Sequence, residues 1–360
     1  MLAEAGVELV VGSGIAQASR AGTRLTSIEL NDGTTVKGSV FIDATYEGDL
    51  LAAAGVDFTV GREGESQYNE PLAGRRPLVP GICYGFQSIV DPFVSDATEQ
   101  VLPLIWAGDL AGEGAGDAKV MSYNYRLCLT NATAASGGKR MELTKPVEYD
   151  PTLYELARRY LKVMKPPETL TPSVLKIYSV AAIGDGIKAD VNSAVFPVST
   201  NLVGGSWGYP NGSATERATI IDRHKSYTKG LLWFWKTDPA VPSHLRSAMA
   251  AWAWCRDEWV DNGHFPTQLY VREGRRMVGE TVVTQLDATS RSRAHGVGTA
   301  SIGVADYAFD VHPVEILAST TSGSATSTKR ATVEGCTGGR PVSVRATIVL
   351  LLSPSVCLLV

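Results

Sequence analysis

The distribution of apolar and polar residues over the first sixty positions predicts a β-meander. Residues typical of strands cluster at 8–11, 24–30 and 35–42, and in the last segment apolar and polar side chains alternate. Between the second and third segments stands Asn31-Asp32-Gly33, a strong hairpin signal because glycine tolerates a positive φ. The chain is therefore expected to begin with antiparallel strands.

A connection from strand to helix is predicted next. Val40-Phe41-Ile42 is an apolar run typical of a short, fully buried strand, and Asp43-Ala44-Thr45 are small or turn-forming residues. Gly48-Asp49 then precede a helical run rich in leucine and alanine that ends at Gly55. Since α/β sheets bind their ligands at the carboxyl ends of strands, this corner is a candidate site. An ordinary strand–helix connection in any α/β protein would show the same local pattern.

The region from residue 61 to 300 carries mixed signals, with a helical second half. Strands are expected around residues 81–90. Pro151 suits the first turn of a helix, and Asp150 can cap it. The predicted helices are 151–164, 214–237, 242–261 and 272–285.

The end of the chain changes character twice. From Ser319 to Thr328 all but two residues are serine or threonine, which is typical of a linker. Residues 342–360 then become apolar, but Pro354 interrupts them, and the uninterrupted run is shorter than the roughly 20 residues of a membrane span. We expect no membrane span. A buried or interfacial segment, a degraded anchor and a shifted reading frame are the alternatives, and the abrupt change favours the last.

Composition excludes several classes of protein. A length of 360 residues suggests about two domains, and a hydrophobic content of 44 % is ample for a core. A net charge of −4 provides no basic field for nucleic acid or an anionic membrane. The five cysteines form no CxxC or Cys/His cluster, so no metal or iron–sulfur site is predicted, and their odd number argues against a disulfide framework. The sequence after Met1 lacks the features of a signal peptide, so a cytoplasmic location is expected.

Four well-separated blocks stand out along the chain. They are FIDATYEGDLLAAAGV (41–56, with VGRE at 60–63), YNYRLCLT (123–130), YVREGRRMVG (270–279) and SIGVADYAFDVH (301–312). In this order they resemble the blocks of a family of FAD-dependent oxidoreductases, over about residues 1–317. The resemblance implies a flavoprotein that binds FAD noncovalently. It also implies transfer of a hydride or electrons to or from a small organic substrate, with an electron acceptor that the sequence does not identify.

The resemblance also implies a fold class. This is an α/β protein with a partial FAD-binding, Rossmann-like domain of the glutathione-reductase-like kind, a β-meander and a larger, mixed α+β substrate domain. Residues 1–60 would form the C-terminal part of the flavin domain and 61–300 the substrate domain. Residues 301–317 would return to the flavin domain, and 318–360 would be a linker and an aberrant apolar tail. Asp43, Ala44, Thr45 and Asp49 of the first block are the expected FAD-binding residues.

The dinucleotide fingerprint GxGxxG is the expected start of such a flavin domain. Gly12-Ser13-Gly14 invites this assignment, but Gln17 occupies the place of the third glycine. Strand signals resume at Leu25, which leaves too little chain for a crossover helix. We interpret Gly12 and Gly14 as a strand bend or bulge. The chain is therefore expected to lack parts of the family's domain at both ends and to bind FAD weakly or not at all.

The second block supplies candidate substrate ligands. Tyr123, Asn124, Tyr125 and Arg126 offer hydroxyl, amide and guanidinium groups within four positions. On a strand the two tyrosines would share one face, and Asn124 and Arg126 the other. Such a cluster suits an oxygen-rich substrate or the edge of a flavin, and the alternative is an edge strand with solvated polar groups.

The third block supplies two candidate catalytic arginines. On the predicted helix Arg272 and Arg276 lie four residues apart on one face. Two guanidinium groups can bind a carboxylate, a phosphate or the carbonyl side of a flavin, where positive charge favours the reduced, anionic form. Gly274 stands where the family usually has alanine. The alternative is a surface helix with an ion pair to Glu273.

The fourth block contains His312, a candidate acid or base near neutral pH. Val311 replaces a serine of the family pattern, and Ala305-Asp306 replace a glycine and a serine. These departures weaken the assignment of His312. The remaining histidines are expected to be structural; they are His224, His244, His264 and His295.

Tryptophans gather in the middle region, at positions 207, 233, 235, 252, 254 and 259. Most are expected to fill the core between helices, and platforms that stack on sugar rings are the alternative. Two other functions therefore stay open beside the oxidoreductase. One is a carbohydrate-binding or polysaccharide-acting protein, and the other is a non-enzymatic remnant.

Overall fold

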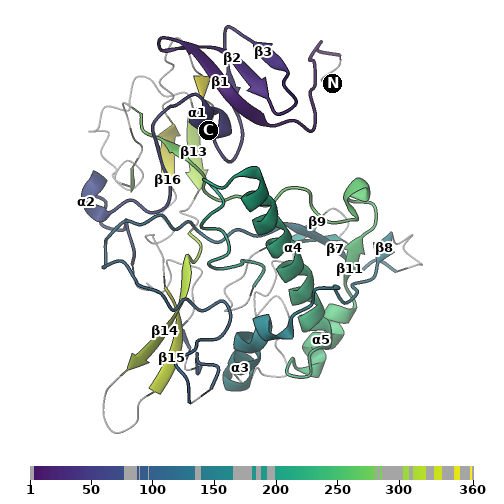
Figure 1. Cartoon of the computed structure of the whole chain (residues 1–360). Helices are drawn as coiled ribbons and strands as arrows, with labels where there is room; N and C mark the ends of the chain where they lie inside the picture. The colour runs from purple at the N-terminus through teal and green to yellow at the C-terminus, as the bar shows by residue number, and fades with distance from the viewer. Residues whose placement is uncertain are drawn as a thin grey trace. The chain divides into compact units, whose positions relative to one another are not determined.

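The structure, a computed structural model, divides into two compact units, which we describe separately (Figure 1). Unit 1 comprises Met1–Val60, Glu273–Tyr307 and Ser343–Val360, and unit 2 comprises Gly61–Arg272 and Ala308–Val342. The functional boundaries expected from the sequence stay a prediction. The residues that the structure describes are 4–76, 87–88, 90–95, 97–133, 139–164, 181–183, 188–192, 199–279, 282, 284–285, 303–307, 311–321, 328–334, 344–348 and 357–358.

Unit 1 begins with the predicted meander. Strands β1 (Ile15–Ala21), β2 (Arg24–Leu30) and β3 (Thr35–Lys37) form an antiparallel sheet in the order β1-β2-β3. Gly33 has a φ of 84° in the turn between β2 and β3, so the hairpin prediction is confirmed. The Asp32 carboxylate closes this turn by accepting a hydrogen bond from the Thr34 amide at 2.9 Å.

Three details of the predicted meander are wrong. Residues 8–11 form no strand, because Val11 and its apolar neighbours are exposed and have nothing to pack against. The third strand ends at Lys37, and Ile42–Asp43 form a separate short strand, β4. Nor is β4 fully buried, since Phe41 is buried but Val40 and Ile42 on either side of it are exposed.

The interpretation of the early glycines fits the structure. Gly12 has a φ of 80° directly before β1, and the pairing of β1 with β2 is irregular between Ile15 and Gln17. Residues 15–21 form a strand, so no crossover helix follows Gly14.

Helix α1 (Asp49–Ala53) covers the meander and completes the small core of unit 1. Leu50 and Ala54 pack with Leu25 and Phe41. The other strands of the unit pair two by two: β5 (Phe58–Thr59) with β12 (Arg276–Met277), β13 (Gly303–Tyr307) with β16 (Val344–Ile348), and β4, in parallel, with β17 (Cys357–Leu358). Mixed helices and mainly antiparallel sheets are thus the observed architecture of the described residues.

Unit 2 is built on a five-stranded antiparallel sheet. Its order is β8 (Arg140–Met141), β11 (Ala253–Cys255), β7 (Leu127–Thr130), β10 (Lys188–Val191) and β9 (Ala181–Ile183). The YNYRLCLT block ends in β7, the central strand. Its residues 123–126 precede β7 and lie in no strand, so the strand expected for them, at an edge or not, is wrong. A smaller antiparallel sheet joins β14 (Glu315–Thr321), β15 (Thr328–Glu334) and β6 (Gln87–Ser88).

Two predicted helices of unit 2 are confirmed. Helix α4 (Ala214–Thr237) has the predicted bounds, and Ser213 and Glu216 form a capping box at its start. A 3-10 turn, Pro151–Tyr154, leads into α3 (Glu155–Met164). The Asp150 carboxylate caps this turn by accepting a hydrogen bond from the Thr152 amide at 2.9 Å. Unit 2 also contains the short helix α2 (Glu65–Tyr68) and a 3-10 turn at Val260–Asn262.

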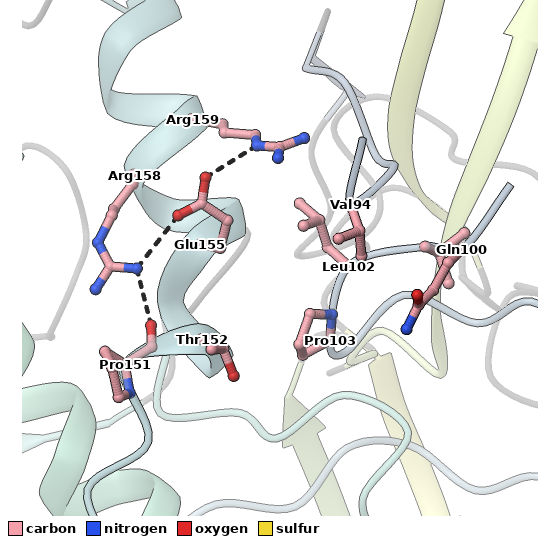
Figure 2. A pocket seen from close by; sticks show the side chains of 10 residues that line it. Val94, Gln100, Leu102, Pro103, Pro151, Thr152, Glu155, Arg158 and Arg159 are labelled. Atoms are coloured by element: carbon pink, nitrogen blue, oxygen red, sulfur yellow. Dashed lines mark hydrogen bonds and ion pairs between the residues drawn. The ribbon is translucent and has the colours of Figure 1, made fainter. Parts of the chain in front are cut away.

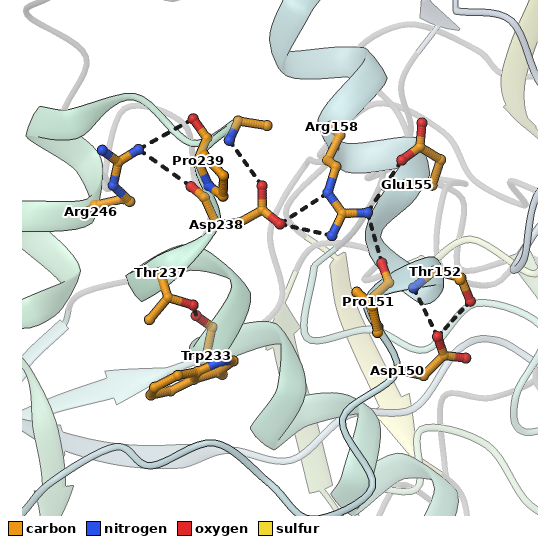
Figure 3. Close-up of polar contacts among 11 residues, drawn as sticks. Asp150, Pro151, Thr152, Glu155, Arg158, Trp233, Thr237, Asp238, Pro239 and Arg246 are labelled. Carbon is orange, nitrogen blue, oxygen red and sulfur yellow. Dashed lines mark hydrogen bonds and ion pairs between the residues drawn. The ribbon is translucent and has the colours of Figure 1, made fainter.

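Aromatic packing and one ion pair join α3 to α4. The Tyr154 hydroxyl donates to the Tyr227 carbonyl at 2.9 Å, and the Tyr154 ring stacks on Phe234 at 5.3 Å between centroids. At the end of α4, the Asp238 carboxylate accepts two hydrogen bonds from Arg158 of α3, at 2.8 and 3.0 Å (Figure 3).

Two other helix predictions are wrong. The helix predicted at 242–261 ends as α5 (Ser243–Ala250), because Ala253–Cys255 pair with β7 and β8 and enter the sheet as β11. The segment 272–279 is extended, and Arg276 and Met277 pair with β5. A side chain at Gly274 would lie 2.3 Å from the Tyr46 carbonyl oxygen, so this segment takes the course that its glycine permits.

A buried ion network joins distant parts of unit 2. The Glu315 carboxylate is fully buried and pairs with Arg62 at 3.1 Å and with Lys119. Arg62, from the VGRE sequence, also donates to Asp117 at 2.9 Å. Burial opposes the charge of Arg62, but its hydrogen bonds and the two carboxylates outweigh burial and raise its pKa. Lys119 also lies 4.8 Å from the ring centroids of both Trp106 and Trp207.

The tryptophans and cysteines were only partly anticipated. Trp235 and Trp254 are buried in the core, as expected. Despite the odd number of cysteines, Cys128 and Cys255 form a disulfide. No helix among the described residues has both the length and the apolar character needed to cross a membrane.

Candidate functional site

Three of the four sequence blocks meet at Ser122–Asn124 in unit 2. The Asn124 carbonyl accepts a hydrogen bond from the Tyr270 amide at 2.9 Å, and the Ser122 carbonyl accepts one from Arg272 Nη1 at 2.5 Å. The Ser122 amide donates to the Pro313 carbonyl at 3.0 Å, directly after His312. Residues 122–124 are therefore the point at which the second, third and fourth blocks come together.

A segment that sequence reasoning missed, residues 199–206, runs beside residues 122–124. The Leu202 amide donates to the Tyr123 carbonyl at 3.2 Å, and the Tyr123 amide donates to Ser206 Oγ at 3.1 Å. The signal available in the sequence was a run of serine, threonine and asparagine followed by Gly204-Gly205. Gly204 has a φ of 76°, which lets the chain turn there.

We call the resulting cluster of buried polar residues the polar centre. None of its members is more than 3 % exposed. They are Ser122, Tyr123, Asn124, Ser199, Thr200, Asn201, Ser206, His224 and His312.

The side-chain amides of the polar centre have fixed orientations. Asn124 Nδ2 donates to Asn192 Oδ1 at 2.9 Å and to Thr200 Oγ1 at 3.3 Å. Asn201 Nδ2 lies 3.3 Å from His312 Nδ1. Because both NH₂ groups are used within the protein, the amide oxygens point elsewhere.

Several oxygens of the polar centre lack a hydrogen bond. Ser122 Oγ, Asn124 Oδ1 and Asn201 Oδ1 have no partner among the residues that the structure describes. An unsatisfied buried polar group costs about 1–3 kcal/mol, and folded proteins retain few without a water, an ion or a functional reason. These atoms therefore require donors from outside the described protein.

A second pair in the polar centre joins Ser206 and His224. Ser206 Oγ lies 3.2 Å from His224 Nε2, and Gly204, Ser206 and Gly208 have the GxSxG spacing of many hydrolases. The pair does not suit nucleophilic catalysis. Ser206 is fully buried, and burial together with the charges of Arg223 and Arg272 lowers the pKa of His224 to about 3. His224 Nδ1 also has no partner among the described residues, so no carboxylate orients the ring.

The remaining residues of the second block have separate roles. Tyr125 is buried against Phe265, with ring centroids 4.7 Å apart, and burial raises its pKa to about 12. Arg126 is half-exposed, pairs with Asp190 and contacts the Tyr270 ring. Asn124 and Tyr123 belong to the polar centre, whereas Tyr125 and Arg126 lie outside it, between the polar centre and β7.

The two predicted catalytic arginines do not share a helix face. Arg272 binds the Ser122 carbonyl and stacks over the Tyr270 ring, 5.2 Å from its centroid. Arg276 belongs to strand β12 of unit 1. The helical spacing that predicted their joint action is therefore wrong.

In the Asp43 corner of unit 1, neighbouring residues of the same chain supply the hydrogen bonds to the Asp43 carboxylate. Asp43 Oδ1 accepts hydrogen bonds from the Thr45 amide at 3.0 Å and hydroxyl at 2.7 Å, and Asp43 Oδ2 accepts one from the Leu51 amide at 3.0 Å. Thr45 Oγ1 in turn accepts from the Gly48 amide at 3.0 Å. Asp43 is buried and holds the start of α1, while Ala44 and Thr45 are exposed at the end of β4.

The third sequence block also reaches this corner. Arg275 Nη1 donates to Asp49 Oδ1 at 2.7 Å and to the Glu47 carbonyl at 3.2 Å. Its guanidinium group lies over the Phe58 ring, 5.3 Å from the centroid. Arg275, which the sequence analysis did not select, therefore neutralises Asp49 and fixes this corner to the segment after residue 272.

A separate cavity of about 690 Å³ lies between the start of α3 and the loop at 94–103 (Figure 2). Its charged side chains are already paired, since Glu155 accepts from Arg158 at 3.2 Å and from Arg159 at 3.0 Å. None of the predicted site residues lines it. The cavity therefore adds nothing to the candidate site.

Comparison with known families decides the class of this chain. A sequence model of the family described as "FAD dependent oxidoreductase" matches residues 1–333. The chain belongs to this family. Its cofactor is accordingly FAD, and its class is that of flavoprotein oxidoreductases. No curated protein and no solved structure matches the chain.

The Asp43 corner does not fit the diphosphate part of FAD. A diphosphate needs amide donors or cations, as at a glycine-rich turn before a helix. Here the carboxylate of Asp43 and the hydroxyl of Thr45 already take the Leu51 and Gly48 amides, and Asp49 adds a negative charge. Arg275 is paired with Asp49. We therefore assign no reaction step to this corner.

The contrast between two buried serines can be measured. Ser206→Ala leaves the Tyr123 amide and His224 Nε2 without their partner, so it should lower the free energy of unfolding by about 1–3 kcal/mol. Ser122→Ala removes a hydroxyl that has no described partner, so the change should stay within about 0.5 kcal/mol. Urea unfolding of both variants measures this difference. An equal loss in both would show that Ser122 Oγ is bonded.

His224 should make unit 2 sensitive to acid. An unfolded histidine titrates near 6.5, whereas the folded pKa of His224 is about 3. Between these values the unfolded chain binds a proton that the folded chain does not. The free energy of unfolding should therefore fall by up to about 1.4 kcal/mol per pH unit as the pH drops below 6.5.

His224→Gln should remove this component. The measurement is the difference between the urea midpoints at neutral and mildly acidic pH, with His244→Gln as the control for loss of a histidine elsewhere. If wild type and His224→Gln lose stability equally on acidification, His224 is not the group responsible.

Proposed function

We propose that this chain is a flavin-dependent oxidoreductase whose organic substrate binds at the polar centre, and that this substrate is rich in hydroxyl groups. The family gives the cofactor and the reaction class, which is transfer of a hydride or electrons between FAD and the substrate. The observation that supports the substrate site is the set of buried oxygens without donors at Ser122, Asn124 and Asn201.

The argument for the substrate class rests on hydrogen-bond direction. Amide oxygens only accept hydrogen bonds, and the NH₂ groups of Asn124 and Asn201 are already engaged. A carboxylate or phosphate offers only acceptors and cannot supply donors to these oxygens. Hydroxyl groups supply the missing donors, and Ser122 Oγ can donate or accept.

His312 is the proposed acid–base residue. Asn201 Nδ2 carries hydrogens, so its contact with His312 Nδ1 makes Nδ1 an acceptor and leaves the ring proton on Nε2. In this tautomer the Nε2–H group can donate a hydrogen bond to a substrate oxygen, and the acid or base role of His312 stays a prediction. Arg272 is proposed as a positioning residue, because its guanidinium holds the Ser122 carbonyl. A role of Arg276 stays a prediction.

The two alternatives from the sequence are outcomes of the same experiments. A hydroxyl-rich ligand that binds without any flavin-dependent oxidation or reduction would favour a carbohydrate-binding or polysaccharide-acting protein. Absence of both ligand binding and flavin binding would favour the non-enzymatic remnant. A small-molecule substrate and an unidentified electron acceptor are the proposed partners, and the cytoplasmic location expected from the sequence stays a prediction.

Ligand selectivity tests the proposed substrate class. D-Sorbitol and D-glucose should raise the Tm of the wild type more than that of Ser122→Ala and Asn201→Leu, while acetate and phosphate should not discriminate. Polyols stabilise most proteins through exclusion from the surface, so only the difference between wild type and variant counts. At about ten times Kd the extra rise should be about 3–5 °C. The proposed substrate class would be overturned by equal Tm shifts in the wild type and both variants, or by a rise with phosphate or acetate that is larger in the wild type.

We further propose that this polypeptide, as it stands, binds FAD weakly, because the Asp43 corner presents carboxylates and engaged amides to a diphosphate. The measurement is the ratio of FAD to protein after gel filtration of chain that was mixed with excess FAD. We expect far less than one FAD per chain. Near-stoichiometric, yellow protein would contradict this proposal without affecting the ligand selectivity of the polar centre.

A further inference from the structure

Cys128 and Cys255 face each other across the central sheet of unit 2. Strands β7 and β11 are antiparallel, with Thr130 opposite Ala253 and Leu129 opposite Trp254. The next pair in this register is Cys128 and Cys255, whose Cα atoms are 5.7 Å apart and whose sulfurs are bonded. This separation lies within the usual range for disulfides.

We infer that this bond is a permanent structural disulfide and that the chain therefore folds in an oxidising compartment. Cytosolic thiols are kept reduced, and disulfides in cytosolic proteins are mostly transient, catalytic or redox-sensing. The Cys128–Cys255 bond does not fit those uses. Cys128 is 7 % exposed and Cys255 is 1 % exposed, so neither sulfur is open to attack by a thiolate in the folded protein.

The chemistry balances with a dithiol–disulfide oxidant of that compartment. The two thiols lose two protons and two electrons as the sulfur–sulfur bond forms. The electrons reduce the disulfide of the oxidant to a dithiol, which takes up the protons. This exchange must precede packing of the sheet, because both sulfurs are buried afterwards.

The disulfide also stabilises the strands next to the polar centre. Tyr123 and Asn124 directly precede β7, and β11 continues from α5. The disulfide joins positions 127 residues apart in sequence, so it restricts the unfolded chain and fixes the register of β7 against β11. The proposed oxidising compartment thus differs from the cytoplasmic location predicted from the sequence.

The inference can be tested on the full chain expressed in two settings. One sample is directed to the bacterial periplasm, and the other is made in a reducing cytosol. Free thiols are blocked by alkylation in denaturant, and the unreduced protein is digested and analysed by mass spectrometry. We expect the periplasmic sample to contain a linked peptide pair holding Cys128 and Cys255, with neither residue alkylated. Alkylation of both residues in that sample would overturn the inference.

Stability provides the second measurement. The Tm of the dithiol form, and of Cys128→Ala/Cys255→Ala, should lie about 5–10 °C below that of the disulfide form. Cys357→Ala is the matched control and should leave both the linked peptide pair and the Tm unchanged. If the dithiol form unfolds at the same temperature as the disulfide form, the bond is incidental and the compartment inference fails.

Discussion

The buried ion pairs around Glu315 are the constraint on which the polar centre depends. A carboxylate taken out of water costs several kcal/mol unless cations and hydrogen bonds replace the lost solvation, and here Arg62 and Lys119 supply them. The same stretch of chain, residues 312–317, carries His312 and also binds the Ser122 amide, through Pro313. Pairing of Glu315 therefore stabilises this segment in unit 2. An ion network that touches no expected ligand thus helps to hold His312 and Pro313 beside Ser122.

The two candidate sites differ in how their polar groups are satisfied. In the Asp43 corner each carboxylate oxygen of Asp43 has a partner from its own chain, and Asp49 is paired with Arg275. The carboxylates of this corner are therefore engaged in contacts that stabilise the local structure. The polar centre has buried amide and hydroxyl oxygens that the described protein does not satisfy. Buried polar atoms without hydrogen-bond partners indicate a functional site more directly than charged residues do. Such atoms lower the stability of the protein, so stability alone does not explain why they are kept.

Local signals in the sequence predicted the elements that local interactions fix. Asn31-Asp32-Gly33 predicted the hairpin, and the helical run at 214–237 predicted α4, whose start is fixed locally by the capping box of Ser213 and Glu216. Strand β11 was not predicted, because its alanine and tryptophan residues continue a helical pattern. Its pairing partner β7 is more than a hundred residues away in the sequence. Residues 199–206 were missed for the same reason. Their serine and asparagine residues are typical of a loop, and only the folded structure shows that they lie beside Tyr123. The resemblance to the family selected Asn124 and His312 as candidates, but it did not select residues 199–206, whose side chains contact both.

The covalent loop between Cys128 and Cys255 has a consequence for the chain when it is cut. This loop contains α3, α4 and α5, so it includes most of the helical part of unit 2. A protease that cleaves one peptide bond inside it leaves two fragments that migrate as one molecule until a reductant is added. Nicked protein would keep β7 and β11 in register and could retain its fold, so a single band on a non-reducing gel is no proof of an intact backbone.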